Sequence, residues 1–277
     1  MATYVTSDAH GHVRALDRAL ELASIGPEDT LYVLGDMVDR GPDPVGVLRL
    51  VKSLPNTHVL MGNHENMLLT TLSTGDQVDL LTWEMNGGGT TAAGLDGCSR
   101  EEYIDLVEWI ENLGLFDVIE VGGRTYILVH AGIDALALRA YLATADYGPD
   151  EGYAHIPHVL LRAAMAKQDP EDMLWIRGEF WGEPTGLVGQ DGAGPVVIAG
   201  HTPTVLLARY AVGMSRRVLD ERERACMVEV GACWDTGGVA DRIDIDCSAA
   251  AGAPVGRVGV MRLDDHRIFY ADIENGE

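Results

Sequence analysis

The sequence predicts an α/β fold, because short apolar runs with strand character alternate with helical patterns in the early part of the chain. Five runs of β-branched and aliphatic residues look like buried strands, at positions 4–6, 31–34, 58–61, 126–129 and 196–199. A side chain of a type that commonly binds metal follows each run within a few residues. Because ligand sites in α/β sheets form at the carboxyl ends of strands, these five ends are expected to build one convergent site.

Three helices are indicated in the same part of the chain. Apolar residues spaced for one helix face occur at Val13, Leu16, Leu20 and Ala23. Asp43-Pro44 supplies an N-cap and a proline at the first position of a second helix. Ser99 and Glu102 form a capping-box pattern at the start of a third helix.

Two segments depart from this alternation. Residues 72–97 are less regular, and Gly87-Gly88-Gly89 within them is typical of a flexible loop or of one that another group approaches closely. Residues 133–195 indicate a helical insertion that ends in a Gly/Pro-rich loop. No internal repeat or linker divides the chain, so we expect a single domain over residues 1–277 that carries this insertion.

The composition is that of a globular protein with a strongly acidic balance. The 277 residues include 43 acidic and 20 basic side chains, which gives a formal charge of −23. Such a surface repels nucleic acid and anionic membranes, so neither is expected as a partner. No apolar run reaches the roughly 18 residues that span a bilayer, and the first residues lack a secretory pattern, so a cytoplasmic location is expected. The four cysteines lack Cys-x-x-Cys spacing and are interpreted as incidental thiols.

The motifs that follow the strands supply metal ligands of mixed type. Asp8-Ala9-His10 has the period-two spacing that points both functional side chains the same way, although this pattern alone also fits a turn with a satisfied histidine. Asp36 has two carboxylate oxygens and can therefore bridge two metals. Asn63 offers a carbonyl oxygen, whereas His130 and His201 offer nitrogens. Oxygen and nitrogen ligands together favour transition-type divalent cations.

These ligands divide between two metals. One metal would be held by Asp8, His10 and Asp36. The other would be held by Asp36, Asn63, His130 and His201. Two metals roughly 3.5–4 Å apart would bridge a hydroxide and clamp a phosphoryl oxygen.

Five motifs occur in a fixed order along the chain. They are Asp-x-His-Gly at 8–11, Gly-Asp-x-Val-Asp-Arg-Gly at 35–41, Gly-Asn-His-Glu at 62–65, His-Ala-Gly at 130–132 and Gly-His-Thr-Pro at 200–203. The set resembles the phosphoprotein phosphatase family of calcineurin-like metallophosphoesterases, and within it the bacterial and phage serine/threonine phosphatase branch. Segments 83–88 and 174–177 resemble further parts of that branch. The resemblance covers about the first two thirds of the chain.

The resemblance implies a four-layer αββα sandwich of two mixed sheets, with the metals at its edge. It also implies the ligand assignment given above and two divalent cations, manganese most commonly, with iron or zinc as alternatives. In such enzymes a hydroxide that bridges the metals attacks phosphorus in line, so no serine or cysteine nucleophile is needed.

Further residues are expected to act on the substrate. His64 would protonate the leaving alkoxide as general acid, and Asp39 would orient its imidazole as in the resembling enzymes. Arg40 and Arg177 would clamp phosphate oxygens with their guanidinium groups, and Asn63 would share this phosphate contact. Two other interpretations stay open, because Asp39-Arg40 also fits a local surface ion pair and Arg177 also fits an exposed helix residue.

Two features fall outside these roles. Glu65 is expected to begin the next helix, where a carboxylate is favourable. Relatives often carry an Ile-Asp-Thr-Gly turn followed by paired glycines, whereas here Ile243–Ser248 is followed by three alanines. This departure does not touch the metal ligands, but it leaves the choice of substrate open.

The sequence therefore predicts a two-metal phosphomonoesterase, of the serine/threonine or dual-specificity protein phosphatase type. Its partner would be a phosphorylated protein or a small phosphoester. A symmetrical diadenosine polyphosphate hydrolase of the same fold is an alternative, although the sequence shows no adenine-stacking pocket. A non-catalytic metal-binding scaffold is a third, and the presence of His64, Asp39 and Arg40 argues against it.

Overall fold

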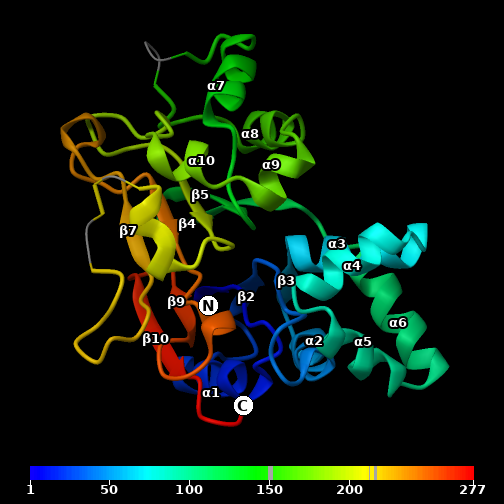
Figure 1. Ribbon diagram of the computed structural model, residues 1–277. Coiled ribbons are helices and arrows are strands. Elements are labelled where there is room, and N and C mark those ends of the chain that lie inside the picture. The colour runs from blue at the N-terminus through cyan, green and yellow to red at the C-terminus, as the bar shows by residue number, and fades with distance from the viewer. Residues whose placement is uncertain (149–151, 212, 215–216) are drawn as a thin grey trace. The chain divides into compact units, whose positions relative to one another are not determined.

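The computed structural model describes residues 1–148, 152–211, 213–214 and 217–277. The chain folds as two compact units, each with its own five-stranded mixed sheet (Figure 1). Unit 1 comprises residues 1–114, 221–225 and 247–277, and unit 2 comprises residues 115–220 and 226–246. That the whole chain forms one domain stays a prediction.

The sheet of unit 1 has the strand order β10-β9-β1-β2-β3. Its strands are β1 (Thr3–Thr6), β2 (Thr30–Val33), β3 (Thr57–Val59), β9 (Arg257–Arg262) and β10 (Arg267–Asp272). β1, β2 and β3 are parallel, with Val5 opposite Tyr32, while β9 pairs antiparallel with both β1 and β10. The three parallel strands correspond to the first three predicted strands, so their carboxyl ends meet at one edge of this sheet.

Six helices belong to unit 1. They are α1 (Val13–Ala23), α2 (Pro44–Ser53), α3 (Asn63–Thr74), α4 (Gln77–Met85), α5 (Gly89–Asp96) and α6 (Arg100–Glu111). The three helices predicted from caps and periodicity are confirmed as α1, α2 and α6. The Asp43 carboxylate accepts a hydrogen bond from the Gly46 N–H at 2.8 Å, and the Ser99 hydroxyl accepts one from the Glu102 N–H at 3.2 Å.

The segment 72–97 contains the end of α3, all of α4 and all of α5, which its sequence did not predict. The apolar side chains of α4 explain this, because Val78 is 69% exposed and Met85 is 87% exposed. Because these apolar residues do not form one buried face, their spacing in the sequence does not show the helix period that would predict a helix. The turn between α4 and α5 is a close-approach turn, since a Cβ on Gly88 would lie 2.4 Å from the Trp83 ring.

The sheet of unit 2 has the strand order β4-β5-β6-β8-β7. Its strands are β4 (Phe116–Val121), β5 (Arg124–Val129), β6 (Val196–Ala199), β7 (Val228–Val230) and β8 (Arg242–Asp244). β5, β6 and β8 are parallel, and β4 and β7 pair antiparallel at the two edges. The predicted strands at 126–129 and 196–199 are confirmed as β5 and β6, and they are adjacent, so their carboxyl ends also share an edge.

Residues 133–195 form helices of unit 2, with residues 149–151 lying outside the described part. These helices are α7 (Ala135–Ala143), α8 (His158–Met165), α9 (Pro170–Trp175) and α10 (Gly178–Gly182). Short 3-10 turns follow at η1 (Thr204–Arg209) and η2 (Trp234–Thr236) in unit 2 and at η3 (Ala249–Ala251) in unit 1. Trp181 and Phe180 pack in the core of unit 2 together with strand residues such as Ile127 and Val197.

Two further observations bear on the sequence predictions. In the turn where relatives carry glycines, Ser248 has a φ of 59° and Gly252 a φ of 63°, so this chain keeps a left-handed backbone at one position with a serine. Among the described residues, no helix is both long and apolar enough to cross a membrane.

Candidate active site

Three loops meet at the carboxyl edge of the unit 1 sheet. They follow β1, β2 and β3, and backbone hydrogen bonds join the first loop to the second. The Asp8 N–H donates to the Gly35 carbonyl at 3.1 Å, and the His10 N–H donates to the Asp36 carbonyl at 2.9 Å. The parallel order of the strands thus places on neighbouring loops residues that lie 26 positions or more apart in the chain.

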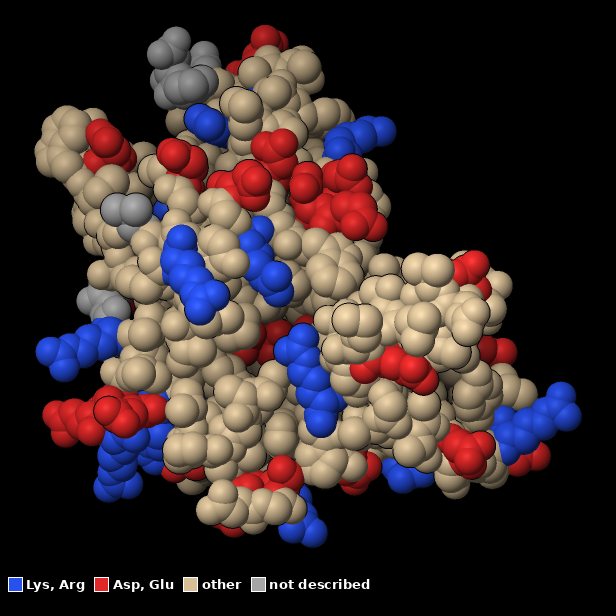
Figure 2. Space-filling model, in the orientation of Figure 1, with Lys and Arg blue, Asp and Glu red and all other residues tan. Residues whose placement is uncertain are grey.

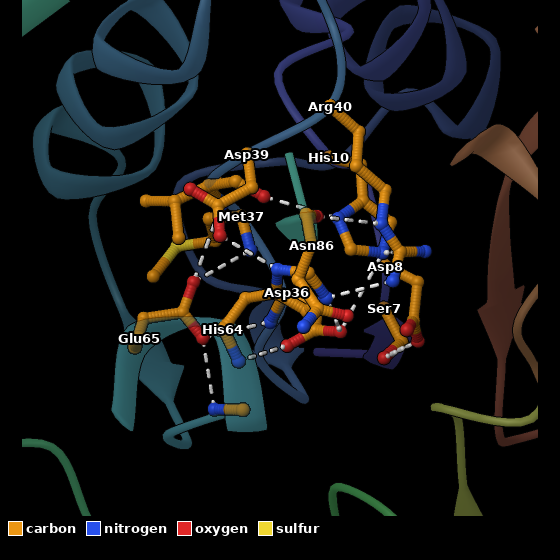
Figure 3. Close-up of polar contacts among 12 residues, drawn as sticks. Ser7, Asp8, His10, Asp36, Met37, Asp39, Arg40, His64, Glu65 and Asn86 are labelled. Atoms are coloured by element: carbon orange, nitrogen blue, oxygen red, sulfur yellow. Dashed lines mark hydrogen bonds and ion pairs between the residues drawn. The ribbon is translucent and has the colours of Figure 1, made fainter. Parts of the chain in front are cut away.

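The candidate ligands on these loops are buried. The exposed fractions are 1% for Asp8, 2% for His10, 2% for Asp36 and 3% for Asn63. Ligand atoms of His10, Asp36 and His64 all lie within 4.8 Å of one another (Figure 3). Asp8 stands outside this closest group, and its Oδ2 accepts a hydrogen bond from the Ser7 hydroxyl.

The two ring nitrogens of His10 differ in protonation. Nδ1 lies 3.0 Å from the Val38 carbonyl oxygen, which can only accept, so Nδ1 carries the proton. Nε2 therefore has the lone pair, and it lies 3.5 Å from Asp36 Oδ2. A histidine whose far nitrogen is held by a carbonyl is the usual arrangement around a protein-bound metal. The carboxylate and imidazole donors gathered here are of the types that hold a divalent cation, so the donor set of unit 1 fits such an ion.

His64 forms a buried pair with Asp39. His64 Nδ1 donates to Asp39 Oδ2 at 2.6 Å, and the two residues are 1% and 0% exposed. His64 Nε2 accepts from the Arg40 guanidinium at 2.8 Å, so both ring nitrogens are engaged within unit 1. The interpretation of Asp39-Arg40 as a local ion pair is wrong, because Asp39 pairs with His64 instead.

Trp83 and Thr91 also hold Asp39, a role that the sequence did not predict. Trp83 Nε1 donates to Asp39 Oδ2 at 3.0 Å, and the Thr91 hydroxyl donates to Asp39 Oδ1 at 2.6 Å. Arg40 is fixed to the same turn, since its N–H donates to the Gly87 carbonyl at 3.1 Å. A Cβ on Gly87 would lie 2.7 Å from Arg40 Cγ, so glycine is required for this approach. The segment 83–88, noted above for its resemblance and its glycines, therefore supports the His64–Asp39 pair.

Glu65 is a further residue whose role the sequence missed. Its carboxylate is fully buried and accepts hydrogen bonds from four backbone N–H groups of the loops that carry the candidate ligands (Figure 3). The donors are Asp36 at 2.9 Å, Met37 at 2.7 Å, Val38 at 3.3 Å and Gly62 at 2.9 Å. Burial raises the pKa of the Glu65 carboxyl, and these N–H groups oppose that rise because they favour the anion. Its spacing three residues after Gly62, at the start of α3, was the available signal.

The loops hold several site residues in a strained backbone. Positive φ values between 41° and 68° occur at Asp8, His10, Asp36, Asp39, Arg40 and His201. Non-glycine residues adopt this left-handed region at a cost and persist in it only where surrounding contacts impose it. Their concentration in the predicted ligand motifs is independent support for a functional site.

Unit 2 brings the two remaining candidate histidines together. His130 follows β5 and His201 follows β6, and the Gly200 N–H donates to the His130 carbonyl at 2.7 Å. Their ring centroids are 5.1 Å apart, and the residues are 0% and 4% exposed. Arg177 is the half-buried N-cap residue of α10 and forms no ion pair within the part of the chain that the structure describes. That these residues share a site with the ligands of unit 1 stays a prediction.

Residues 1–225 match the Metallophos family, described as calcineurin-like phosphoesterase. The chain belongs to this family of metallophosphoesterases. The membership confirms the predicted metallophosphoesterase fold class, with mixed sheets and helices, and it confirms the predicted enzyme class, a metal-dependent hydrolase of phosphoric esters.

Curated relatives include symmetrical bis(5'-nucleosyl)-tetraphosphatases. The protein of Aggregatibacter actinomycetemcomitans is 31% identical over 141 residues, which cover 48% of this chain and 45% of that protein. The protein of Marinomonas sp. is 35% identical over 135 residues, with coverage of 48% and 45%. The matched segment is thus about half the length of either protein.

Solved structures share the fold at low sequence identity. A protein proposed to be a diadenosine tetraphosphatase aligns with a TM-score of 0.57 and 18% identity over 99% of this chain and 94% of that chain. The cold-active protein-tyrosine phosphatase of a psychrophilic Shewanella sp. aligns with a TM-score of 0.52 and 19% identity over 98% and 80%. These likenesses show the fold alone.

Proposed function

We propose that this protein is a two-metal phosphomonoesterase in which His64 is the general acid. The observation that carries the proposal is the buried His64–Asp39 pair, which lies within the same cluster as the candidate ligands His10 and Asp36. A binding protein would have no use for a histidine held in this way, so the pair argues against the scaffold alternative.

One metal is proposed to be held by Asp8, His10 and Asp36, and the other by Asp36, Asn63, His130 and His201. Carboxylate, amide and imidazole donors suit manganese, iron or zinc, and manganese is the ion to test first. When bound, two such cations lower the pKa of water and neutralise charge on the phosphoryl oxygens.

His64 is proposed to give a proton from Nε2 to the leaving oxygen. Asp39 keeps Nδ1 in its donor state, so the proton that leaves is the one on Nε2. In the structure Arg40 donates to this same nitrogen. A phosphate group that takes over the donors of Arg40 would free Nε2 to take up a proton from solvent, and Nε2 would then give that proton to the leaving oxygen.

Arg40 and Arg177 are proposed to bind phosphate oxygens. Guanidinium groups form two parallel hydrogen bonds to such oxygens and keep their charge at any relevant pH. Neither arginine forms an ion pair with a carboxylate within the described residues, so both are available to an anion. Asn63 is proposed to share the phosphate contact from the first turn of α3.

The substrate favoured by this geometry is a phosphomonoester with a poor leaving group, as in phosphoserine or phosphothreonine of a protein. An alkoxide leaves with great difficulty unless it is protonated, so the well-held His64 has most value there. Phosphotyrosine and small phosphoesters are further candidates, since the metal site would recognise phosphate and not the alcohol.

The second candidate is symmetrical hydrolysis of a dinucleoside tetraphosphate, which the names of the curated relatives favour. That reaction releases a nucleoside diphosphate, which is stable as an anion and needs a general acid less. Because the matched segment covers about half of each relative, the hydrolysis panel below decides between the two substrates.

A hydrolysis panel with manganese-loaded protein tests the proposal. It compares phosphoserine, phosphothreonine and phosphotyrosine peptides with diadenosine tetraphosphate and a cyclic phosphodiester. Faster turnover of the monoesters supports the first candidate, and faster release of ADP from diadenosine tetraphosphate replaces it with the second. Full activity in excess chelator, with no metal detected by elemental analysis, would refute both.

A further inference from the structure

Unit 2 contains a cavity of about 920 Å³ beside α7, α9 and α10. Such a volume lies at the upper end of the range for ligand pockets, roughly 300–1,000 Å³, and exceeds what a phosphate group alone needs. The lining combines apolar side chains, the indole of Trp175, two arginines and five carboxylates. Of these lining residues, only Arg177 has a role in the function proposed above.

The cavity adjoins a proposed metal ligand through Trp175. The indole lines the cavity, and its ring lies 5.9 Å from the His201 ring at an interplanar angle of 85°. Arg177, two residues further along the chain, lines the same cavity. A substrate whose phosphate reaches Arg177 would therefore place its leaving group within this space.

Buried polar contacts fix one wall of the cavity. Arg242 is 1% exposed, and its guanidinium donates to the carbonyls of Phe180 at 2.7 Å, Trp181 at 2.9 Å and Glu183 at 2.6 Å. Asp241 holds the next part of the wall, because its Oδ2 accepts from the Thr185 N–H at 2.6 Å. α10 and the segment after it are thus anchored to β8, which indicates a preformed site.

The charge distribution in the cavity is uneven. The carboxylates are those of Asp134, Glu171, Asp172, Glu179 and Glu183, and the arginines are Arg139 and Arg177. Figure 2 shows acidic side chains gathered over α9 and α10. Burial raises the pKa of the Asp172 carboxyl, and the repulsion from Asp134 and other acidic neighbours raises it further. A ligand with a positive group would relieve this repulsion, whereas a polyanion would increase it.

We propose that this cavity binds the leaving-group side of a phosphopeptide that carries arginine or lysine beside the phosphorylated residue. The inference rests on the proposed function and narrows its substrate. Arg177 receives the phosphate, Trp175 and the apolar lining receive the backbone and side-chain stems, and the carboxylates of α9 receive the positive group. The long polyphosphate chain of a dinucleotide meets an unfavourable field in the same place.

The test measures kcat/KM for two phosphoserine peptides that differ only in flanking arginine or glutamate. Manganese-loaded protein is used throughout, and each rate is divided by turnover of p-nitrophenyl phosphate by the same preparation. We expect kcat/KM to be about tenfold higher for the arginine peptide, because two partly solvated charge contacts together contribute about that much. The preference falls toward one in the Glu171→Gln/Asp172→Asn double variant and reverses in Glu171→Lys. The exposed Asp235→Asn variant, on η2 of the same unit, serves as the matched control and keeps the preference.

The outcomes separate the inference from the proposed function. An equal preference in the wild type and the double variant overturns the cavity assignment while leaving phosphomonoester hydrolysis intact. Turnover of diadenosine tetraphosphate that exceeds both peptides and collapses in Trp175→Ala makes the cavity a nucleotide site instead. Failure to hydrolyse any of these phosphoesters overturns the proposed function, and the inference with it.

Discussion

Glu65 Oε2 accepts a hydrogen bond from the backbone N–H of Asp36 at 2.9 Å, which ties the start of α3 to the loop that carries this proposed bridging ligand. The same oxygen accepts from Gly62, and Oε1 accepts from Met37 and Val38. A single carboxylate thus satisfies four buried donors. It also helps to hold Asp36 in its left-handed conformation, with a φ of 52°.

Replacing Glu65 should therefore destabilise unit 1 and weaken metal binding together. Glu65→Ala leaves buried N–H groups without acceptors, each at a cost of about 1–3 kcal/mol, so we expect a loss of several kcal/mol or failure to fold. Glu65→Gln keeps one acceptor oxygen and should retain the fold with lower manganese affinity. Chemical denaturation and manganese titration by isothermal calorimetry check this. The exposed Glu111→Gln, on α6, should behave like wild type in both measurements.

His64→Asn should keep the metal content and lose the acid. We expect a fall in turnover of about 10²–10⁴-fold for phosphoserine peptides, and a much smaller fall for p-nitrophenyl phosphate, whose leaving group needs little protonation. Asp39→Asn should show the same dependence on the leaving group more weakly. Loss of a metal ion in His64→Asn, seen by elemental analysis, would instead make His64 a ligand.

The histidines of unit 2 should be required for one metal and not for the other. His130→Ala and His201→Ala are each expected to lower the metal content from about two ions to about one, because Asp8, His10 and Asp36 would still hold the other ion. His155→Ala removes an exposed histidine of unit 2 and provides the control. Retention of two ions in both variants would refute the proposed division of ligands.

The ion pair between Arg18 and Glu277 should give unit 1 a stability that depends on pH. Its hydrogen bonds to Arg18 lower the pKa of the Glu277 carboxyl to about 2 from its usual value near 4.5. A lowered carboxyl pKa stabilises the fold above the ordinary value, and this contribution disappears as the pH falls through about 2. At pH 7, Glu277→Gln should therefore melt at a lower temperature than wild type, with a loss of stability of at most about 1 kcal/mol. At the acid limit, where the Glu277 carboxyl is protonated, the two proteins should melt at the same temperature. A melting difference independent of pH would contradict this assignment.

The parts of the site that could be predicted are those that depend on residues close together in the sequence. Asp8, Asp36 and His130 each follow a run of β-branched and aliphatic residues, so strand ends and ligands could be found together. The contacts of Trp83 and Thr91 could not, because they reach Asp39 from 44 and 52 positions away. α4 was missed since its apolar residues other than Trp83 are exposed. The substrate cavity was missed since its lining is assembled from residues 133–139 and 171–184.

The order of strands in unit 1 has a consequence for how the protein is made. β1 directly precedes the first candidate ligand motif and lies in the middle of its sheet, with β2 on one side and β9 on the other. Its partner residues on β9, Met261 and Arg262, lie more than 250 positions later in the chain. On the ribosome, β1 emerges long before β9 and must wait for it, with all of unit 2 translated in between. The loops that carry the candidate ligands would be exposed throughout that interval, so metal ions should enter a stable site only after synthesis has passed β9.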